Sequence, residues 1–208
     1  MSIEGYSVDA QTVPFSVPWR GSDFALVRAT FGAKGEDRHA AEHLARAQTA
    51  DVLSLGAWHL LRGDATGEGQ AEAFWRRTLE LEDAFGRLSL GVRVEPLPPP
   101  AAPWDLPGYS FALRAFLTRL RELAGRPCAV GGAARYLSSM ALPGEVVEAP
   151  LWLLDSGPTP PPWERVWIQT ATPDDVLQLD RFAGDAADWR MVFGLGAMPP
   201  CRAEGGDA

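Results

Sequence analysis

Phe-Ala-Leu-Val-Arg at residues 24–28 and Val-Leu-Ser-Leu-Gly-Ala-Trp at residues 52–58 are two short apolar runs of strand length. Between them, Asp37 is placed to cap a helix that runs to about Thr49 and keeps its small and apolar residues on one face. A strand, a helix and a second strand in this order are typical of a βαβ unit. The stretch therefore predicts a parallel sheet covered by helices.

The same alternation continues along most of the chain in both directions. Apolar runs predict eight strands, at Ile3–Val8, Phe24–Arg28, Val52–Trp58, Leu88–Val94, Cys128–Gly131, Ala149–Leu154, Arg165–Gln169 and Val176–Leu179. Further helical patterns cover Gln70–Phe85, Tyr109–Ala124 and the short stretch Ala133–Met140. Eight strands are the number that a (β/α)8 barrel needs.

Two proline-rich stretches limit how regular this barrel can be. Pro158–Pro162 joins the sixth and seventh expected strands and leaves no room for a helix, and Pro96–Pro103 follows the fourth strand as a stiff loop. We therefore expect an α/β fold, an irregular TIM-like barrel that forms a single domain over residues 1–195. The polar end of the chain, residues 196–208, is expected to be a flexible tail.

Charge and composition argue against several kinds of partner. The 208 residues carry a formal net charge of -8, which attracts neither nucleic acid nor anionic lipid. No segment approaches the roughly 18–20 apolar residues of a membrane span, and the first residues, Met-Ser-Ile-Glu, do not resemble a signal peptide. No metal motif uses Cys128 or Cys201, and we expect no disulfide between them. We therefore expect a protein made in the cytoplasm, with no metal or cofactor and no nucleic-acid or membrane partner.

Seven segments carry more specific information than this alternation. They are Gly5-Tyr6-Ser7-Val8-Asp9, Phe24-Ala25-Leu26-Val27-Arg28-Ala29-Thr30-Phe31-Gly32, Gly56-Ala57-Trp58-His59-Leu60, Arg93-Val94-Glu95, Pro150-Leu151-Trp152-Leu153, Trp167-Ile168-Gln169 and Gln178-Leu179-Asp180-Arg181-Phe182-Ala183-Gly184. In this order they resemble the motifs of the family 25 glycoside hydrolases, the Chalaropsis-type lysozymes, over nearly the whole chain. The resemblance implies the same barrel and a muramidase site for peptidoglycan at the carboxyl ends of its strands.

The resemblance also implies four acidic positions in that site, and three of them are changed here. They fall on Ser7, Arg93, Glu95 and Gln178, so only Glu95, at the position of the family's acid, keeps a carboxylate. Glycoside hydrolysis normally needs two carboxyl groups, one of which donates a proton. Arg93 and Glu95 are two residues apart on one strand and share a face. A neighbouring guanidinium favours the ionised form of a carboxylate, whereas a general acid must hold its proton, so we expect Arg93 to impair Glu95.

Two further acids leave an alternative open. Asp9 lies two residues beyond Ser7, and Asp180 lies two residues beyond Gln178, on the same strand faces as the lost acids and one layer farther out. One hypothesis is a relocated acidic cluster of Asp9, Glu95 and Asp180. The other is that Asp9 and Asp180 are solvated residues at the rim.

The candidate substrate contacts are Trp58, His59, Trp152 and Arg93. Tryptophan rings offer flat apolar faces that suit sugars, and His59 follows the end of an expected strand. The simpler interpretation is that the tryptophans fill the barrel and that His59 is a hydrogen-bonded structural histidine. Phe31 stands where the resembling pattern has a polar glutamate, which is a further departure from the family's site.

Three functions remain open from the sequence. The loss of three of four acids favours a lysozyme-like barrel with a degenerate site and little or no hydrolase activity. It would bind peptidoglycan or a related glycan, or serve as an assembly module. The alternative is an active peptidoglycan muramidase that uses Glu95 as its general acid. The third is an interaction protein whose barrel mouth is filled, because a shared fold does not fix function. Without a signal peptide, work at a cell wall implies release by lysis, by a non-classical route or in a particle.

Overall fold

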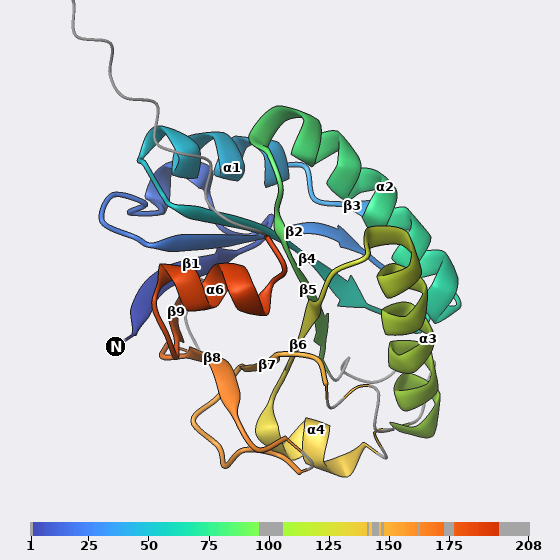
Figure 1. Cartoon of the computed structure of the whole chain (residues 1–208). Coiled ribbons are helices and arrows are strands. Elements are labelled where there is room, and N and C mark those ends of the chain that lie inside the picture. The colour runs from blue at the N-terminus through green and yellow to red at the C-terminus, as the bar shows by residue number, and fades with distance from the viewer. Residues whose placement is uncertain are drawn as a thin grey trace, which may run out of the picture.

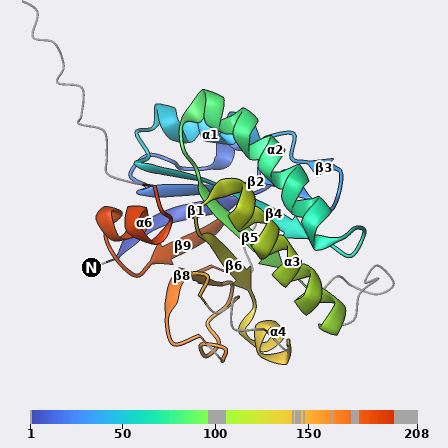
Figure 2. The ribbon, with the colours of Figure 1, turned by 45° about the vertical axis from the view of Figure 1, so that its right-hand side comes forward.

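The computed structural model describes residues 2–95, 106–140, 142, 146, 148–161, 163–172 and 177–195. In this part of the chain a sheet closes on itself as a barrel (Figures 1 and 2). The strands of the barrel are β1 (Ile3–Val8), β2 (Phe24–Phe31), β4 (Ser54–Leu61), β5 (Ser89–Val94), β6 (Cys128–Gly132), β7 (Leu151–Leu153), β8 (Val166–Thr170) and β9 (Gln178–Phe182). They are hydrogen-bonded in the order β1-β9-β8-β7-β6-β5-β4-β2, and β2 pairs again with β1. The expected eight-stranded α/β barrel is confirmed.

The barrel is mixed rather than fully parallel. The strands from β1 to β8 pair with their barrel neighbours in parallel, whereas β9 is antiparallel to both β8 and β1. A two-residue strand, β3 (Gly35–Glu36), folds back on β2. Because β9 runs in the opposite direction, its first residue lies at the end of the barrel where the parallel strands finish.

Four helices follow strands on the outside of the barrel, namely α1 (Ala40–Thr49), α2 (Gly67–Phe85), α3 (Leu106–Ala124) and α4 (Ala134–Ser139). Figure 2 shows α2 and α3 side by side over one flank. The expected helices are all present. The expected N-cap residue is wrong, because the N-cap position of α1 is occupied by His39 and not by Asp37. The Asp37 carboxylate accepts from the backbone N–H of His39 and also binds Arg28.

A further helix, α6 (Ala186–Val192), is not expected from the apolar pattern and closes one end of the barrel. Its N-cap residue is Asp185, whose side chain accepts backbone N–H groups of the first turn. Trp189 is fully buried, stacks on Phe24 with 4.4 Å between ring centroids, and donates from Nε1 to the hydroxyl of Ser89 at 2.8 Å. Phe24 and Ser89 begin β2 and β5, so α6 plugs the amino-terminal end. The carboxyl end remains for a site.

Other expectations concern the rest of the chain. Cys128 is a buried free thiol, and burial raises its pKa. Cys201, the whole stretch Pro96–Pro103 and the tail at 196–208 lie outside the described residues. Among the described helices, none is long and apolar enough to cross a membrane.

Candidate active site

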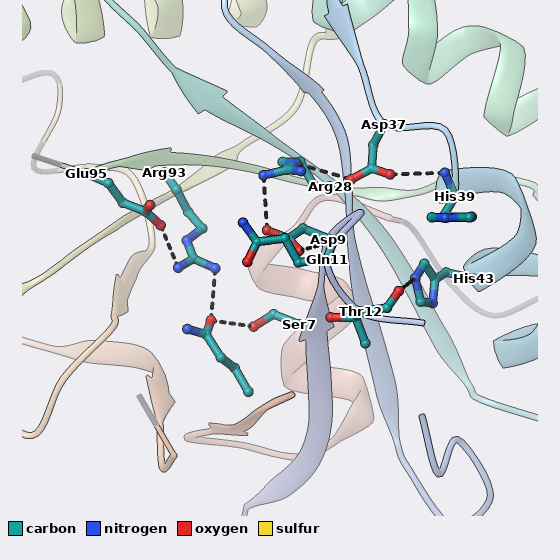
Figure 3. Close-up of polar contacts among 11 residues, drawn as sticks. Ser7, Asp9, Gln11, Thr12, Arg28, Asp37, His39, His43, Arg93 and Glu95 are labelled. Carbon is teal, nitrogen blue, oxygen red and sulfur yellow. Dashed lines mark hydrogen bonds and ion pairs between the residues drawn. The ribbon is translucent and has the colours of Figure 1, made fainter. Parts of the chain in front are cut away.

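Four side chains meet at the carboxyl end of the barrel (Figure 3). Ser7 lies near the end of β1, and the antiparallel register places it opposite Gln178, the first residue of β9. Arg93 is the second-last residue of β5, and Glu95 follows that strand. The Ser7 hydroxyl donates to Oε1 of Gln178 at 3.3 Å, and Nη1 of Arg93 donates to the same oxygen at 2.9 Å. The positions that the sequence singled out therefore lie together.

Arg93 links this group. Its Nη2 lies 2.6 Å from Oε1 of Glu95, and its side chain is only 8% exposed. The guanidinium carbon lies 4.5 Å from the ring centroid of Trp58 and 5.2 Å from that of Trp152. The next strand leaves space for it at Gly131, where a β-carbon would come within 2.8 Å of Cγ of Arg93. The expected Arg93–Glu95 ion pair is confirmed, and aromatic contacts hold the arginine in addition.

Glu95 and Asp180 have very different surroundings. The Glu95 side chain is 38% exposed, whereas Asp180 is fully buried. Oδ1 of Asp180 accepts from the Thr170 hydroxyl at 2.6 Å and from the indole N–H of Trp152 at 3.4 Å. Burial raises the pKa of Asp180, although the Thr170 hydrogen bond and the charge of Arg93 act in the opposite direction. Asp180 is neither a solvated rim residue nor part of an acidic cluster at the rim, so both interpretations from the sequence are corrected. Because β9 is antiparallel, its third residue, Asp180, lies deeper in the barrel than its first residue, Gln178.

Asp9 belongs to a second polar group. Its Oδ2 accepts from Nη1 of Arg28 at 3.0 Å, and Nε of Arg28 also lies 3.2 Å from Oδ2 of the buried Asp37. Figure 3 shows this group beside, and not joined to, the contacts of Arg93. The hypothesis of a relocated acidic cluster is therefore corrected. Each carboxyl has partners of its own, and one of the three is enclosed in the barrel.

The candidate sugar-binding aromatic residues are enclosed as well. Trp58 is 2% exposed and Trp152 is fully buried, and their rings meet edge to face with centroids 6.1 Å apart. Their faces are also turned to the Arg93 guanidinium. We therefore reassign both tryptophans from substrate contacts to the packing of the barrel, the simpler of the two interpretations that the sequence offered.

His59 is also a structural residue, because its ring is enclosed in the protein. It is fully buried, with Nδ1 2.8 Å from the Thr30 hydroxyl and Nε2 3.1 Å from Oε1 of Gln70. The Gln70 amide nitrogen donates to the carbonyl oxygens of Arg62 and Ala65, which turns Oε1 towards the histidine. Nε2 must then carry the ring proton and donate it. Burial lowers the pKa of His59 to about 4, so the ring is neutral at physiological pH.

The sequence interpretation missed the Arg28–Asp37 pair and the surroundings of Phe31. The Phe31 ring centroid lies 5.2 Å from the guanidinium carbon of Arg28 and 5.0 Å from that of Arg62. A signal was present, because an arginine within the apolar run of β2 needs a buried partner, and Asp37 was available nearby. In the part of the chain that the structure describes, no three His, Cys, Asp or Glu side chains are grouped to hold a metal ion.

Comparisons with known proteins address the fold. No protein-family profile matches the chain, and no curated protein matches it by search. Among solved structures, a family GH25 lysozyme from Aspergillus fumigatus matches with a TM-score of 0.73 and 18% identity over 93% of this chain and 99% of that one. A family 25 glycosyl hydrolase from Bacillus anthracis matches with a TM-score of 0.73 and 16% identity over 91% of this chain and 92% of that one.

A third match is the modular autolysin LytC from Streptococcus pneumoniae, solved in complex with a synthetic peptidoglycan ligand. It has a TM-score of 0.64 and 12% identity over 86% of this chain and 46% of that one. At these identities the likeness concerns the fold alone. The chain has the barrel fold of the family 25 lysozymes and muramidases, as the sequence resemblance implied.

Proposed function

We propose that this protein, a barrel with the fold of the family 25 glycoside hydrolases, is a relative that does not hydrolyse peptidoglycan. It binds peptidoglycan or a related glycan, or it serves as an assembly module. The observation that carries the proposal is the placement of Arg93. Its guanidinium stands where the resemblance implies a carboxylate, and it contacts Glu95, Gln178 and two tryptophan rings. A side chain with this many partners is part of the architecture of the barrel mouth.

The chemistry of glycoside hydrolysis gives the physical reason. One carboxyl group must donate a proton to the leaving oxygen, while positive charge develops on the sugar ring in an oxocarbenium-like transition state. A guanidinium beside the reacting sugar repels that charge, whereas a carboxylate attracts it. The Glu95 oxygen that faces Arg93 is engaged at 2.6 Å and is not free to protonate a leaving group. Both effects raise the barrier to cleavage.

One observation favours the alternative, an active muramidase with Glu95 as its general acid. The Glu95 side chain is 38% exposed at the position that the resemblance gives to the acid. If Arg93 withdrew when substrate bound, Glu95 would be accessible. The two functions therefore differ in whether the wild-type protein releases reducing ends from peptidoglycan.

The test uses purified peptidoglycan sacculi with two readouts, reducing ends released and protein that sediments with the sacculi. We expect sedimentation without hydrolysis. A triple variant, Ser7→Asp, Arg93→Asp and Gln178→Asp, restores the carboxylates that the resemblance implies and should gain measurable hydrolysis. Glu95→Gln in the triple background is the matched control and should remove the gain. Hydrolysis by the wild type that Glu95→Gln abolishes would overturn the proposal and support the active muramidase. If the wild type neither hydrolyses nor sediments, the glycan-binding role fails and the assembly role remains.

A further inference from the structure

The Phe31 side chain faces the barrel mouth because the pairing of β2 with β4 is irregular. The register between these strands shifts between Arg28 and Thr30. Thr30 faces outward, where its hydroxyl contacts His59. Phe31 turns the other way and packs against the aromatic and aliphatic side chains inside the barrel, although it remains partly exposed. A flat apolar ring therefore borders the mouth at the position where the resemblance implies a glutamate.

Arg62 reaches the same ring from the neighbouring strand. It lies two residues beyond Leu60, which is packed inside the barrel, and side chains two apart on a strand share a face. Its guanidinium carbon lies 5.0 Å from the Phe31 ring centroid. Because β4 and β5 pair in parallel as far as their last residues, Arg62 and Glu95, which follow these strands, lie side by side. Phe31, Arg62 and Glu95 together border what we call the rim site.

Arg62 differs in its partners from the other two arginines of the barrel mouth. The guanidinium of Arg28 contacts two carboxylates, and that of Arg93 contacts one carboxylate and an amide oxygen (Figure 3). Among the described residues, the Arg62 side chain has no ion pair or hydrogen bond, and its buried Nε lacks an acceptor. The carboxylate of Asp64, on the same loop, accepts instead from a backbone N–H group between β2 and β3. A partly buried guanidinium is normally compensated by a carboxylate, so Arg62 has donors available for an acidic group from outside the chain.

We propose that the rim site binds a carboxylate-bearing sugar, and that Arg62 is the residue that holds the carboxylate. A guanidinium can bind a carboxylate through two parallel hydrogen bonds. The partly exposed ring of Phe31 offers an apolar face to the sugar. The negative charge of Glu95 is compensated by Arg93 and does not oppose an acidic ligand strongly. This inference rests on the proposed glycan-binding role and adds the chemical class of the glycan.

The net charge of the chain distinguishes between two kinds of acidic glycan. A chain of formal net charge -8 repels a polymer that carries a phosphate on every repeat unit. Separate carboxylates on an otherwise neutral glycan meet less repulsion, and one guanidinium holds one such group. The observations therefore favour carboxylates over a dense phosphate polymer as the acidic groups that Arg62 binds.

The test compares three preparations of peptidoglycan sacculi. One is untreated, in one the carboxyl groups are converted to amides, and from one the phosphate polymers are removed with hydrofluoric acid. Protein that sediments with the sacculi is measured at about 0.15 M salt, where a Debye length of about 8 Å limits the effect of the net charge. The wild type should bind untreated and phosphate-free sacculi equally well, and amidated sacculi at least about tenfold more weakly.

The variant Arg62→Gln tests the role of the guanidinium. It should bind untreated sacculi as weakly as the wild type binds amidated sacculi, and its binding to amidated sacculi should equal that of the wild type. A purely structural role would weaken binding to both preparations, and thermal unfolding shows separately whether the variant is folded. Arg62→Lys keeps the charge and should retain part of the binding. Arg76→Gln, at an exposed arginine on the outer helix α2, is the matched control and should bind as the wild type does.

The outcomes separate this inference from the proposed function. Equal binding of the wild type to untreated and amidated sacculi would overturn the inference and leave the glycan-binding role intact. Equal losses on both preparations in Arg62→Gln would also overturn it. Binding that is lost with the phosphate polymers would identify these polymers, and not carboxylates, as the ligand. A wild type that sediments with none of the three preparations would remove the glycan-binding role and this inference together.

Discussion

Arg93 is the residue that links the side chains at the carboxyl end of the barrel. Arginine suits this position because its planar guanidinium offers several donors, stacks on aromatic rings and is less strongly hydrated than an ammonium group. Here it uses all of these properties at once, through Glu95, Gln178, Trp58 and Trp152. A lysine would keep the charge, but its donors would all lie on one nitrogen instead of two, and the flat contact with the rings would be lost. The contacts that Arg93 makes therefore depend on the shape of its side chain as well as on its charge.

The buried ring of His59 makes stability depend on pH. Its pKa is lowered from 6.5 to about 4 in the folded protein, so between these values only the unfolded chain takes up the proton. Stability from this residue is present above pH 6.5 and is lost as the pH falls towards 4, by about 3 kcal/mol in total. Urea unfolding of the wild type from pH 7 to pH 4 should show this loss, and His59→Gln should show a smaller one. His39→Gln, at a partly exposed histidine, is the control. Equal pH dependence in the wild type and His59→Gln would contradict the account.

Asp180 should make stability depend on pH in the opposite direction to His59. Burial raises its pKa, so as the pH rises the unfolded chain gives up this proton before the folded protein does. Its contribution to stability is greatest at low pH and declines as the pH rises through the ordinary carboxyl range. Asp180→Asn keeps the shape of the side chain and the acceptor for Thr170. We expect a higher unfolding temperature than the wild type at pH 7 and no such gain at pH 3. A lower temperature at pH 7 would indicate an ionised Asp180 held by Arg93.

At the scale of elements, α6 should be a large contributor to stability although it is short. Trp189 is fully buried against Phe24, Phe182 and Phe193 and fills the amino-terminal end of the barrel. Trp189→Ala should cost about 3–5 kcal/mol of unfolding free energy, the usual range for a buried tryptophan. Met191 lies on the same helix and is 70% exposed, so Met191→Ala is the matched control and should change stability little. Similar losses for the two variants in denaturant unfolding would mean that α6 is not a plug.

The strands were predictable because each is a short apolar run, and the helices because their apolar faces repeat with the period of a helix. The direction of β9 was not predictable, since a run such as Leu177 to Phe182 predicts a strand but not whether that strand is parallel or antiparallel to its neighbours. The antiparallel direction of β9 is the reason that Asp180 lies in the interior of the barrel and not at the rim. The pattern also missed α6, because seven residues are too few for a helical period to stand out, although Asp185 is a typical N-cap.

At the scale of the whole molecule, the convergence of Ser7, Arg93, Glu95 and Gln178 followed from the resemblance, since strand ends in a barrel meet at one rim. The Arg93–Glu95 contact was predictable, because the two residues share a strand face. The contacts of Gln178 with Ser7 and Arg93, and those of Arg93 with the tryptophan rings, were not, because they depend on side-chain packing that sequence spacing does not fix. The same limit explains why His59 and the tryptophans were open to two interpretations until their burial was known.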